Sequence, residues 1–299
     1  MCGDWHADAV DKNTMNWQYY CWLDASQSTM SPRTQKTAAF FAAHPVFTRA
    51  EFASAMERPS AAATVASLLG HHLRAGHIKR VSREVFSTVP AHIAAERWFF
   101  DRFTAASKLR MDGVLGYHSA LELHGLAHSE FSEVQVISAG RPGLLKLPTG
   151  PCRFVRPAMI LERHGKLDYQ TVTMDRQGVA IKLTGVERTL VDVLRRPEIC
   201  GGADEVIQSL NLVQYLDPGK VVEYVALLRI RTLAAIVGWW LERKRPVIEV
   251  PEKLQNRIRA LLPRSKHYCL GAKRGDAVLI DRWRVLLPKR IANPTFEGS

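Results

Sequence analysis

The chain of 299 residues carries 41 Lys and Arg residues against 29 Asp and Glu residues, a formal net charge of +12. This length suggests roughly two domains, and a content of 46% hydrophobic and 23% charged residues excludes a disordered or fibrous protein. No run of 18 apolar residues occurs, so no transmembrane helix is expected, and the acidic start lacks the basic region of a signal peptide. The positive charge favours an anionic partner: nucleic acid, an acidic protein or a membrane surface.

Cysteine use gives the expected compartment. The five cysteines are scattered and odd in number, and no two have the C-x-x-C spacing, so neither a zinc site nor a disulfide framework is predicted. A reducing cytoplasm is therefore the expected location. The cysteines are Cys2, Cys21, Cys152, Cys200 and Cys269.

The charge is unevenly distributed. Residues 1–30 carry a net charge of −3 and many aromatic side chains, and they are predicted to be a poorly ordered extension, with a partner-binding arm as the alternative. Residues 31–92 carry +5 and residues 243–299 carry +9. Residues 246–299 are set apart as a basic C-terminal segment.

Residues 31–92, the first of the two positive regions, begin with helix-capping signals. Ser31 followed by Pro32 is typical of a helix start, so a first helix is predicted from there. Thr48 and Glu51 have the spacing of a capping box, in which each side chain satisfies a backbone amide at the start of a helix. A short second helix is therefore predicted, which ends before Pro59.

A third helix and a hairpin complete this region. The third helix is predicted to start near Ser60, to carry an apolar stripe at helical spacing and to end at Gly76. Two short strands, at about 78–81 and 84–87, follow with a basic tip. Three helices followed by a basic hairpin are typical of a winged helix-turn-helix, so residues 31–92 are predicted to form a DNA-binding domain.

The third helix and the hairpin also supply the candidate DNA contacts. A recognition helix buries one face and offers the other to the major groove, and basic residues of a wing bind phosphates or reach a minor groove. Double-stranded DNA is therefore the predicted partner, with an affinity that falls steeply as salt rises. A winged helix that makes only protein contacts is the alternative. The predicted DNA-binding residues are Arg49, Arg58, Ser60, Thr64, Ser67, His71, Arg74, Lys79, Arg80 and Arg83.

Residues 93–245 are predicted to form a mixed α/β domain in which a small sheet precedes a group of helices, an α+β arrangement overall. A helix over 91–109 is predicted to link the two domains. A short helix capped by His118 or Ser119 is predicted to end at Gly125. The further predicted strands are 134–138, 154–156, 168–174 and 179–183. The further predicted helices are 184–194, Gly202 through Leu210, Asp217 through Val225, and 233–242.

Several motifs of this domain, in their order and spacing, resemble the AbiEi family of antitoxins over roughly residues 35–245. The matching segments are Tyr117-His118-Ser119-Ala120-Leu121, His124-Gly125-Leu126, Glu187-Arg188-Thr189-Leu190-Val191-Asp192, Arg196-Pro197, Gly201-Gly202 and 235–241. The motif residues to which the resemblance gives a structural or antitoxin role are Tyr117, His118, Ser119, His124, Gly125, Glu187, Arg188, Thr189 and Asp192.

The resemblance implies a transcriptional autorepressor that is the antitoxin of a two-gene, type IV toxin–antitoxin system. It implies that the N-terminal winged helix binds inverted repeats in the operon's own promoter and that the C-terminal domain counteracts a nucleotidyltransferase-like toxin. Much of the family acts without a stable toxin complex, so direct contact with the toxin stays open. The first 30 residues and the basic tail depart from the family pattern, which leaves a stand-alone relative as an alternative. For the second of the positive regions, residues 243–299, one hypothesis is that it binds RNA or the toxin, without named contact residues.

The sequence does not predict an enzyme. His118, His124 and His128 lie close together, but without an H-E-x-x-H or acid-rich pattern they are predicted to be core or capping residues. Arg188 and Asp192, four residues apart, are predicted to form an ion pair that fixes their helix against the sheet. No glycine-rich phosphate loop or nucleophile elbow is present, so no catalytic residue, metal or cofactor is predicted. The alternatives are a ligand-responsive winged-helix regulator and a nucleic-acid-processing enzyme.

Overall fold

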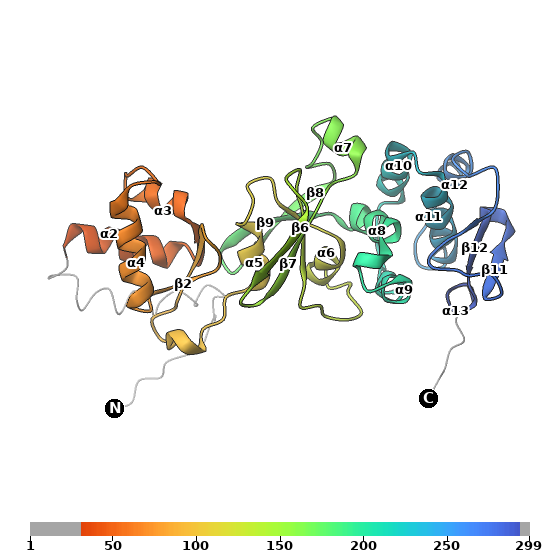
Figure 1. The fold of residues 1–299 in the computed structure, drawn as a ribbon. Helices are drawn as coiled ribbons and strands as arrows, with labels where there is room; N and C mark the ends of the chain where they lie inside the picture. The colour runs from red at the N-terminus through yellow and green to blue at the C-terminus, as the bar shows by residue number, and fades with distance from the viewer. Residues whose placement is uncertain (1–30, 294–299) are drawn as a thin grey trace, which may run out of the picture. The chain divides into compact units, whose positions relative to one another are not determined.

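The structure, a computed structural model, describes residues 31–293. The predicted N-terminal extension therefore lies outside the described residues. The chain divides into two compact units, one of Met1–Arg80 with Phe86–Trp98 and one of Val81–Val85 with Phe99–Ser299, called here the N-terminal unit and the second unit. Both contain helices and a β-sheet (Figure 1), so the predicted α+β class is confirmed.

Three α-helices and a three-stranded sheet make up the N-terminal unit (Figure 1). The strand order is β1-β3-β2, and β2 and β3 form an antiparallel hairpin. The elements are α2 (Pro32–Ala43), β1 (Val46–Thr48), α3 (Arg49–Ala55), α4 (Ala63–Arg74), β2 (Ile78–Arg80), β3 (Val85–Thr88) and a 3₁₀ turn, η1 (Ala95–Arg97).

The caps of these helices agree with the sequence signals. The Ser31 hydroxyl accepts a hydrogen bond from the Thr34 amide at 3.3 Å. The capping box is complete, because the Thr48 amide donates to Glu51 at 2.6 Å and the Glu51 amide donates to the Thr48 hydroxyl at 3.1 Å. Gly76 adopts the left-handed conformation (φ 74°) that ends the α4 segment.

Aromatic side chains fill the core of the N-terminal unit. Phe40 and Phe47 meet edge to face with centroids 5.1 Å apart, and Phe52 and Phe86 pack on the same cluster with Val65. Burying a side chain of this size stabilises a fold by roughly 1.5–3 kcal/mol. Since α4 contributes only its apolar side to this core, its other side stays exposed.

The predicted helix over 91–109 is wrong. The chain forms only η1 there and then α5 (Arg102–Ser107). Trp98 is extended (φ −81°, ψ 125°), and the Asp101 side chain starts a new helix by accepting the Phe103 and Thr104 amides. A local cap therefore overrides the apolar period, and the division between the two units falls at this break.

A six-stranded mixed sheet in the order β6-β7-β5-β4-β9-β8 forms the base of the second unit. The pairs β5–β7 and β4–β9 are parallel and the others antiparallel. The strands are β4 (Val114–Leu115), β5 (Val134–Ile137), β6 (Gly143–Leu147), β7 (Gly150–Val155), β8 (Thr171–Arg176) and β9 (Val179–Thr184).

Helices surround one end of this sheet and continue away from it (Figure 1). The cap of α6 differs from the prediction: Gly116 precedes the helix, whereas His118 and Ser119 are buried within it. The helices are α6 (Tyr117–Leu123), α7 (Met159–Arg163), α8 (Val186–Arg195), η2 (Pro197–Ile199), α9 (Ala203–Asn211), α10 (Pro218–Leu228) and α11 (Arg231–Arg243).

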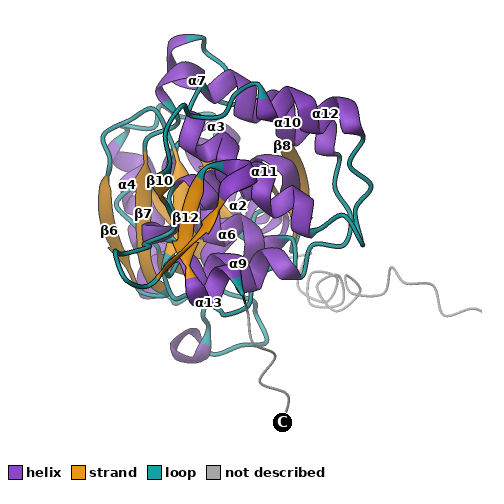
Figure 2. Ribbon diagram, turned by 90° about the vertical axis from the view of Figure 1, so that its right-hand side faces the viewer, coloured by secondary structure: helices purple, strands orange, loops and turns teal. Residues whose placement is uncertain are grey.

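Residues beyond 246 fold onto the same core. Trp283 and Val285 are buried in one hydrophobic cluster with α8, α10 and α11, and Gly238 of α11 leaves the space that the Trp283 ring fills. A small sheet in the order β10-β12-β11 lies beside α11 (Figure 2). The elements are α12 (Glu252–Arg259), β10 (His267–Tyr268), β11 (Ala277–Ile280), η3 (Asp281–Trp283), β12 (Val285–Pro288) and α13 (Lys289–Ala292).

Candidate functional site

The outer face of α4 is polar and carries no acidic residue. Thr64, Ser67, His71 and Arg74 are all exposed and recur at helical spacing, while Val65 on the opposite side is buried. These four belong to the predicted DNA-binding residues, and the structure brings them together on one surface. A surface of this kind matches the donors and acceptors in a major groove and the phosphates beside it.

Arg49, Arg58 and Ser60 lie before α4. Arg58 and Ser60 are exposed, whereas the Arg49 guanidinium is half-buried and donates to the Ser60 carbonyl at 2.7 Å. Arg49 therefore ties the start of α3 to the loop before α4. α4 begins at Ala63, three residues later than predicted, and without a side-chain cap.

The hairpin holds the other three predicted residues. Arg80 is exposed, and its guanidinium lies 5.2 Å from the centre of the Phe86 ring. Arg83 is exposed near the tip, 3.7 Å from the Glu84 carboxylate. Lys79 is half-buried and donates to the Trp98 carbonyl at 2.7 Å, which holds the segment after the hairpin in place.

A histidine cluster lies at the end of α4. His72 and His77 face each other with 3.1 Å between their Nδ1 atoms, and the His72 ring meets Phe41 edge to face. Burial, with His77 and His71 nearby, lowers the pKa of His72 to about 4. His72 is therefore neutral at neutral pH and belongs to the packing of the helix.

The first family motif of the second unit surrounds a buried histidine. The His118 ring is fully buried and stacked on Phe131, and its nitrogens lie 3.2 Å from the Glu122 carboxylate and 3.1 Å from that of Glu205. Arg102 also pairs with Glu122. Burial by itself raises the pKa of Glu205, but hydrogen bonds from Ser129, His118 and Ser209 together outweigh it and lower the pKa. These contacts join α6 to α9.

Backbone amides complete this cluster. The Ser119 hydroxyl accepts the Gln135 amide at 2.8 Å, and the Gln135 side chain accepts the His118 amide at 2.8 Å. His124 contacts the Thr184 carbonyl at 2.8 Å, and Gly125 (φ 69°) ends the α6 segment. The motif therefore fixes α6 on the sheet.

The second motif forms a buried charge cluster around Asp192. The predicted pair is present, with Arg188 Nε 3.4 Å from Asp192 Oδ2 and both side chains almost fully buried. The Tyr224 hydroxyl donates to Asp192 Oδ1 at 2.9 Å, and Arg195 lies 3.5 Å from the same oxygen. Arg195 also donates to the Tyr117 hydroxyl at 2.7 Å, which joins the two motifs.

The two tyrosines of this cluster keep their hydroxyl protons. Burial, with Asp192 nearby, raises the pKa of Tyr117 to about 12 and that of Tyr224 well above its ordinary value. Arg188 donates to the Leu167 and Tyr169 carbonyls at 2.7 and 2.6 Å. These groups therefore serve as fixed donors that hold α8, α10 and the β8 side of the sheet together.

Two motif residues remain. The Thr189 hydroxyl lies 2.7 Å from that of Thr184, and Glu187 accepts the Asp217 amide at 3.0 Å, just before α10. The motif residues thus form the scaffold of the second unit. Most of them have no access to solvent.

Few side chains of residues 31–293 are suited to metal binding or to thiol chemistry. No group of three His, Cys, Asp or Glu side chains there could hold a metal ion, and no helix there has the length and apolar character needed to cross a membrane. Burial raises the pKa of Cys152 to about 12 and that of Cys269 to about 11, so both thiols stay protonated.

Sequence reasoning missed the partners of the motif residues. Glu122, Glu205 and Tyr224 complete the two buried clusters, but they lie outside the quoted motifs and as much as 87 residues away along the chain. Helical spacing alone could have indicated Glu122, four residues after His118. No local signal points to Glu205 or Tyr224.

Comparison with known proteins agrees with this architecture. The crystal structure of the RV2827C protein from Mycobacterium tuberculosis is similar, with a TM-score of 0.56 over 85% of this chain and 90% of that chain at 14% sequence identity, which shows a shared fold. No curated protein matches the chain. The family model of the AbiEi antitoxin C-terminal domain matches residues 113–242, which include both buried clusters. This part of the chain is therefore similar to the C-terminal domain of the AbiEi antitoxins.

Proposed function

We propose that the chain is the antitoxin of a type IV toxin–antitoxin system and represses its own promoter through the N-terminal unit. In this proposal the unit is a winged helix-turn-helix, with α4 as the recognition helix and the β2–β3 hairpin as the wing. The observation that carries it is the face of α4, where Thr64, Ser67, His71 and Arg74 are exposed without a neighbouring carboxylate on the helix.

A mobility-shift assay with the chain's own upstream region tests the repressor half. We expect a sequence-specific shift of duplex DNA that weakens steeply as salt rises. The variant Ser67→Glu places one negative charge on the α4 face and is expected to abolish the shift. Ala42→Glu, which adds a negative charge at an exposed position of α2, is the matched control and is expected to keep it.

The control separates the proposed surface from a general charge effect. Circular dichroism of all variants checks that each has folded. Equal losses in the α4 variant and in Ala42→Glu would show that the face of α4 has no special role. Absence of a specific shift with the folded parent protein would overturn the repressor half altogether.

The antitoxin half rests on the AbiEi domain of the second unit. We propose that this domain counteracts a nucleotidyltransferase-like toxin, by direct contact or without it, and that the chain acts by binding and not by catalysis. Co-expression with the product of the neighbouring gene tests this, since growth should stop with the toxin alone and resume with both. Toxicity that persists in the presence of the folded chain would contradict the proposal.

Inverted promoter repeats are the proposed target, because two copies of a winged helix can occupy two half-sites. Titration of the upstream region should then give two successive shifts. Deletion of one repeat should leave one shift, and unchanged double occupancy would argue against half-site binding.

A further inference from the structure

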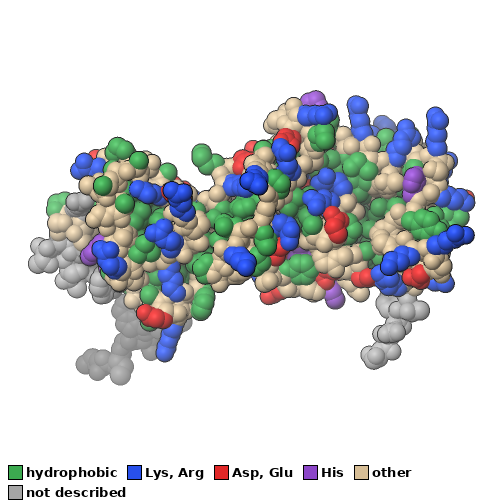
Figure 3. All heavy atoms as spheres, in the orientation of Figure 1, with side chains coloured by type: hydrophobic (Ala, Val, Ile, Leu, Met, Phe, Trp, Pro, Cys, Tyr) green, Lys and Arg blue, Asp and Glu red, His purple; other side chains and the backbone are tan. Residues whose placement is uncertain are grey.

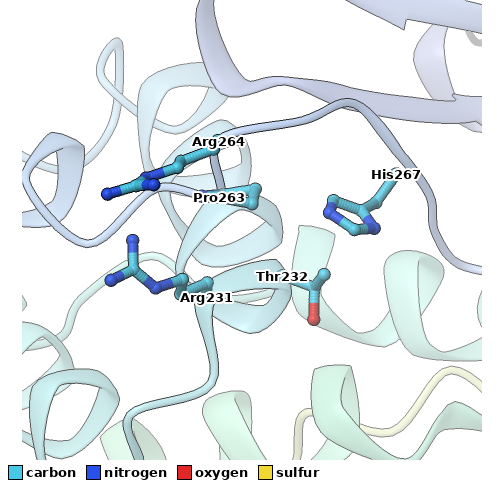
Figure 4. Close-up of a pocket in the computed structure, with 5 residues that line it drawn as sticks. All are labelled: Arg231, Thr232, Pro263, Arg264 and His267. Carbon is cyan, nitrogen blue, oxygen red and sulfur yellow. The ribbon is translucent and has the colours of Figure 1, made fainter.

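A basic pocket of about 540 Å³ lies at the start of α11 in the second unit. Arg231 and Thr232 line it from the first turn of the helix, and Pro263, Arg264 and His267 line it from the segment that leads into β10. Figure 4 shows the two guanidinium groups on one side of the pocket and His267 on the other. Residues of two separate chain segments therefore converge on one space.

The positive charge of this pocket is not neutralised within the described residues. Arg231 donates to the Leu262 carbonyl at 3.1 Å, and neither Arg231 nor Arg264 has a carboxylate partner among residues 31–293. The two positive charges on one side of the pocket repel each other. An anion placed between them is attracted to both and reduces this repulsion. Guanidinium groups also match the oxygen geometry of a phosphate.

A second basic pocket of about 520 Å³ shares Arg264 with the first. Arg284 donates to the Pro263 carbonyl at 2.7 Å, and Arg259 donates to the side chains of Asn256 and Gln255 at 3.0 and 3.3 Å. These neutral acceptors orient the arginines without cancelling their charge. Figure 3 shows lysine and arginine side chains gathered over these C-terminal elements.

Two cationic side chains of the second pocket are paired with carboxylates. Asp281, which also lines this pocket, pairs with Lys266 at 3.2 Å, and Glu242 pairs with Arg282 at 2.6 Å. The arginines of the two pockets without a carboxylate partner among residues 31–293 are Arg231, Arg259, Arg264 and Arg284. Two such pockets in contact suit a chain of phosphates better than one isolated anion.

An apolar pocket of about 300 Å³ adjoins the first one at Arg231. Ala226, Ile230 and Leu261 contribute to its lining, and Ile230 is 37% exposed. Such a surface beside phosphate-binding arginines fits a nucleobase. In a duplex the bases are stacked inside and cannot reach it, whereas the bases of a single strand can turn outward.

We propose that this surface binds single-stranded nucleic acid, with phosphates at Arg231 and Arg264 and an unpaired base against Ile230. The backbone amides and the positive end of α11 add to the attraction for phosphate. About half of the surface lies beyond the region that the antitoxin family model matches. The proposal does not depend on DNA binding by the N-terminal unit.

Fluorescence anisotropy with the full chain tests it, using a labelled mixed-sequence single strand of about twelve nucleotides. Arg264→Glu is the main variant, because this exposed side chain forms no hydrogen bond or ion pair within residues 31–293. Its charge reversal is expected to weaken strand binding about tenfold or more. Arg163→Glu, at an exposed position of α7, makes the same charge change and is expected to alter binding less than about twofold.

Three further measurements decide the ligand. Ile230→Ser places a favoured capping residue at the N-cap position of α11, where the isoleucine forms no side-chain cap. It should weaken strand binding while leaving the weak binding of pyrophosphate unchanged. Equal losses in Arg264→Glu and Arg163→Glu, or no binding of the strand by the parent protein, would overturn the proposal. Displacement of the strand by pyrophosphate or a mononucleotide at equal concentration would instead define a small-nucleotide site. Equal, Arg264-dependent competition by the matching duplex would define a duplex site, and either result overturns the proposal.

Discussion

In the N-terminal unit Arg58, Arg74 and Arg80 are exposed around an aromatic core, whereas in the second unit Arg188 is packed inside and Arg195 nearly so. Arg74 on α4 pairs with no carboxylate of residues 31–293, while Arg188 is held by Asp192 and two backbone carbonyls. The same type of side chain is thus exposed in one unit and fixes helices in the other. Loss of charge should therefore affect affinity in the first and stability in the second.

The sharpest test of this comparison is Asp192→Ala. Removal of one partner leaves the buried Arg188 unpaired and the Tyr224 hydroxyl without its acceptor. Breaking a buried pair in this way destabilises by about 3–5 kcal/mol. Urea unfolding of the full chain, followed by circular dichroism, measures the change in the free energy of unfolding.

Asp168→Ala is the matched control. Asp168 forms an ion pair with Lys182 at 3.0 Å, but both side chains are exposed. Its loss is expected to cost less than about 1 kcal/mol. If the two variants lose similar amounts of stability, the buried charges do not have the structural role assigned to them.

Gly238→Ala is expected to have the next largest effect. A Cβ at this position of α11 would lie 2.0 Å from the Trp283 ring, so the ring must move. Overpacking of a core costs roughly 1–3 kcal/mol, and the displaced indole should change its fluorescence. Gly143→Ala in β6, where the added atom meets nothing within 4 Å, is the control and should leave both quantities nearly unchanged.

Gly238→Ala tests whether the residues beyond 246 pack against α11. A normal free energy of unfolding and normal fluorescence in this variant would mean that η3 and β12 are not held against α11. The C-terminal residues would then not belong to the core of the second unit, and the segment that carries Arg264 would not be held in a fixed position at the basic pocket.

A smaller effect is expected from acid. The pKa of His72 lies at about 4 in the folded chain, because burial and the neighbouring His77 and His71 disfavour its protonation, against an ordinary value of 6.5. Between these values the unfolded chain binds more protons, so the free energy of unfolding falls as the pH is lowered from 6.5 towards 4. The partly exposed ring limits the loss to about 1 kcal/mol.

His72→Leu should remove this part of the pH dependence. Thermal unfolding of the parent protein and the variant at several pH values between 6.5 and 4.5 measures it. His92→Asn, at an exposed position after the hairpin, is the control and should follow the parent protein. Parallel curves for the parent protein and His72→Leu would contradict the assignment.

The smallest predicted effect concerns Arg80 in the hairpin. Arg80→Ala should weaken duplex binding about equally for all sequences. The slope of log affinity against log salt should fall by about 0.9 if Arg80 neutralises one phosphate. An unchanged slope would show that the wing residue does not contact the DNA backbone.

Short sequence patterns correctly predicted the helix starts that depend on a capping side chain close by in the chain. The capping box at Thr48 and Glu51 and the Asp217 cap of α10 are present as expected, because cap and amide lie within three residues of each other. The strand β1 was missed, since three residues show no period, and the exposed strand β6 was missed because its Leu144 and Leu145 do not alternate with polar residues.

The candidate sites differ in the same way. The α4 face follows from helical spacing, so Thr64 and Arg74 could be placed on one surface from the sequence alone. The surroundings of His118 could not, because Glu205 reaches it from another helix. The motif residues therefore showed which segments matter, but the fold was needed to show that they are buried.

Both three-stranded sheets place their last strand in the middle, β3 between β1 and β2 and β12 between β10 and β11. During synthesis neither sheet can form before that central strand has left the ribosome. The N-terminal sheet can therefore close early, while the ribosome is still adding the second unit. The C-terminal sheet must wait for residues 285–288 and the ribosomal tunnel length beyond them. A nascent chain should thus acquire its α4 surface well before its basic pocket.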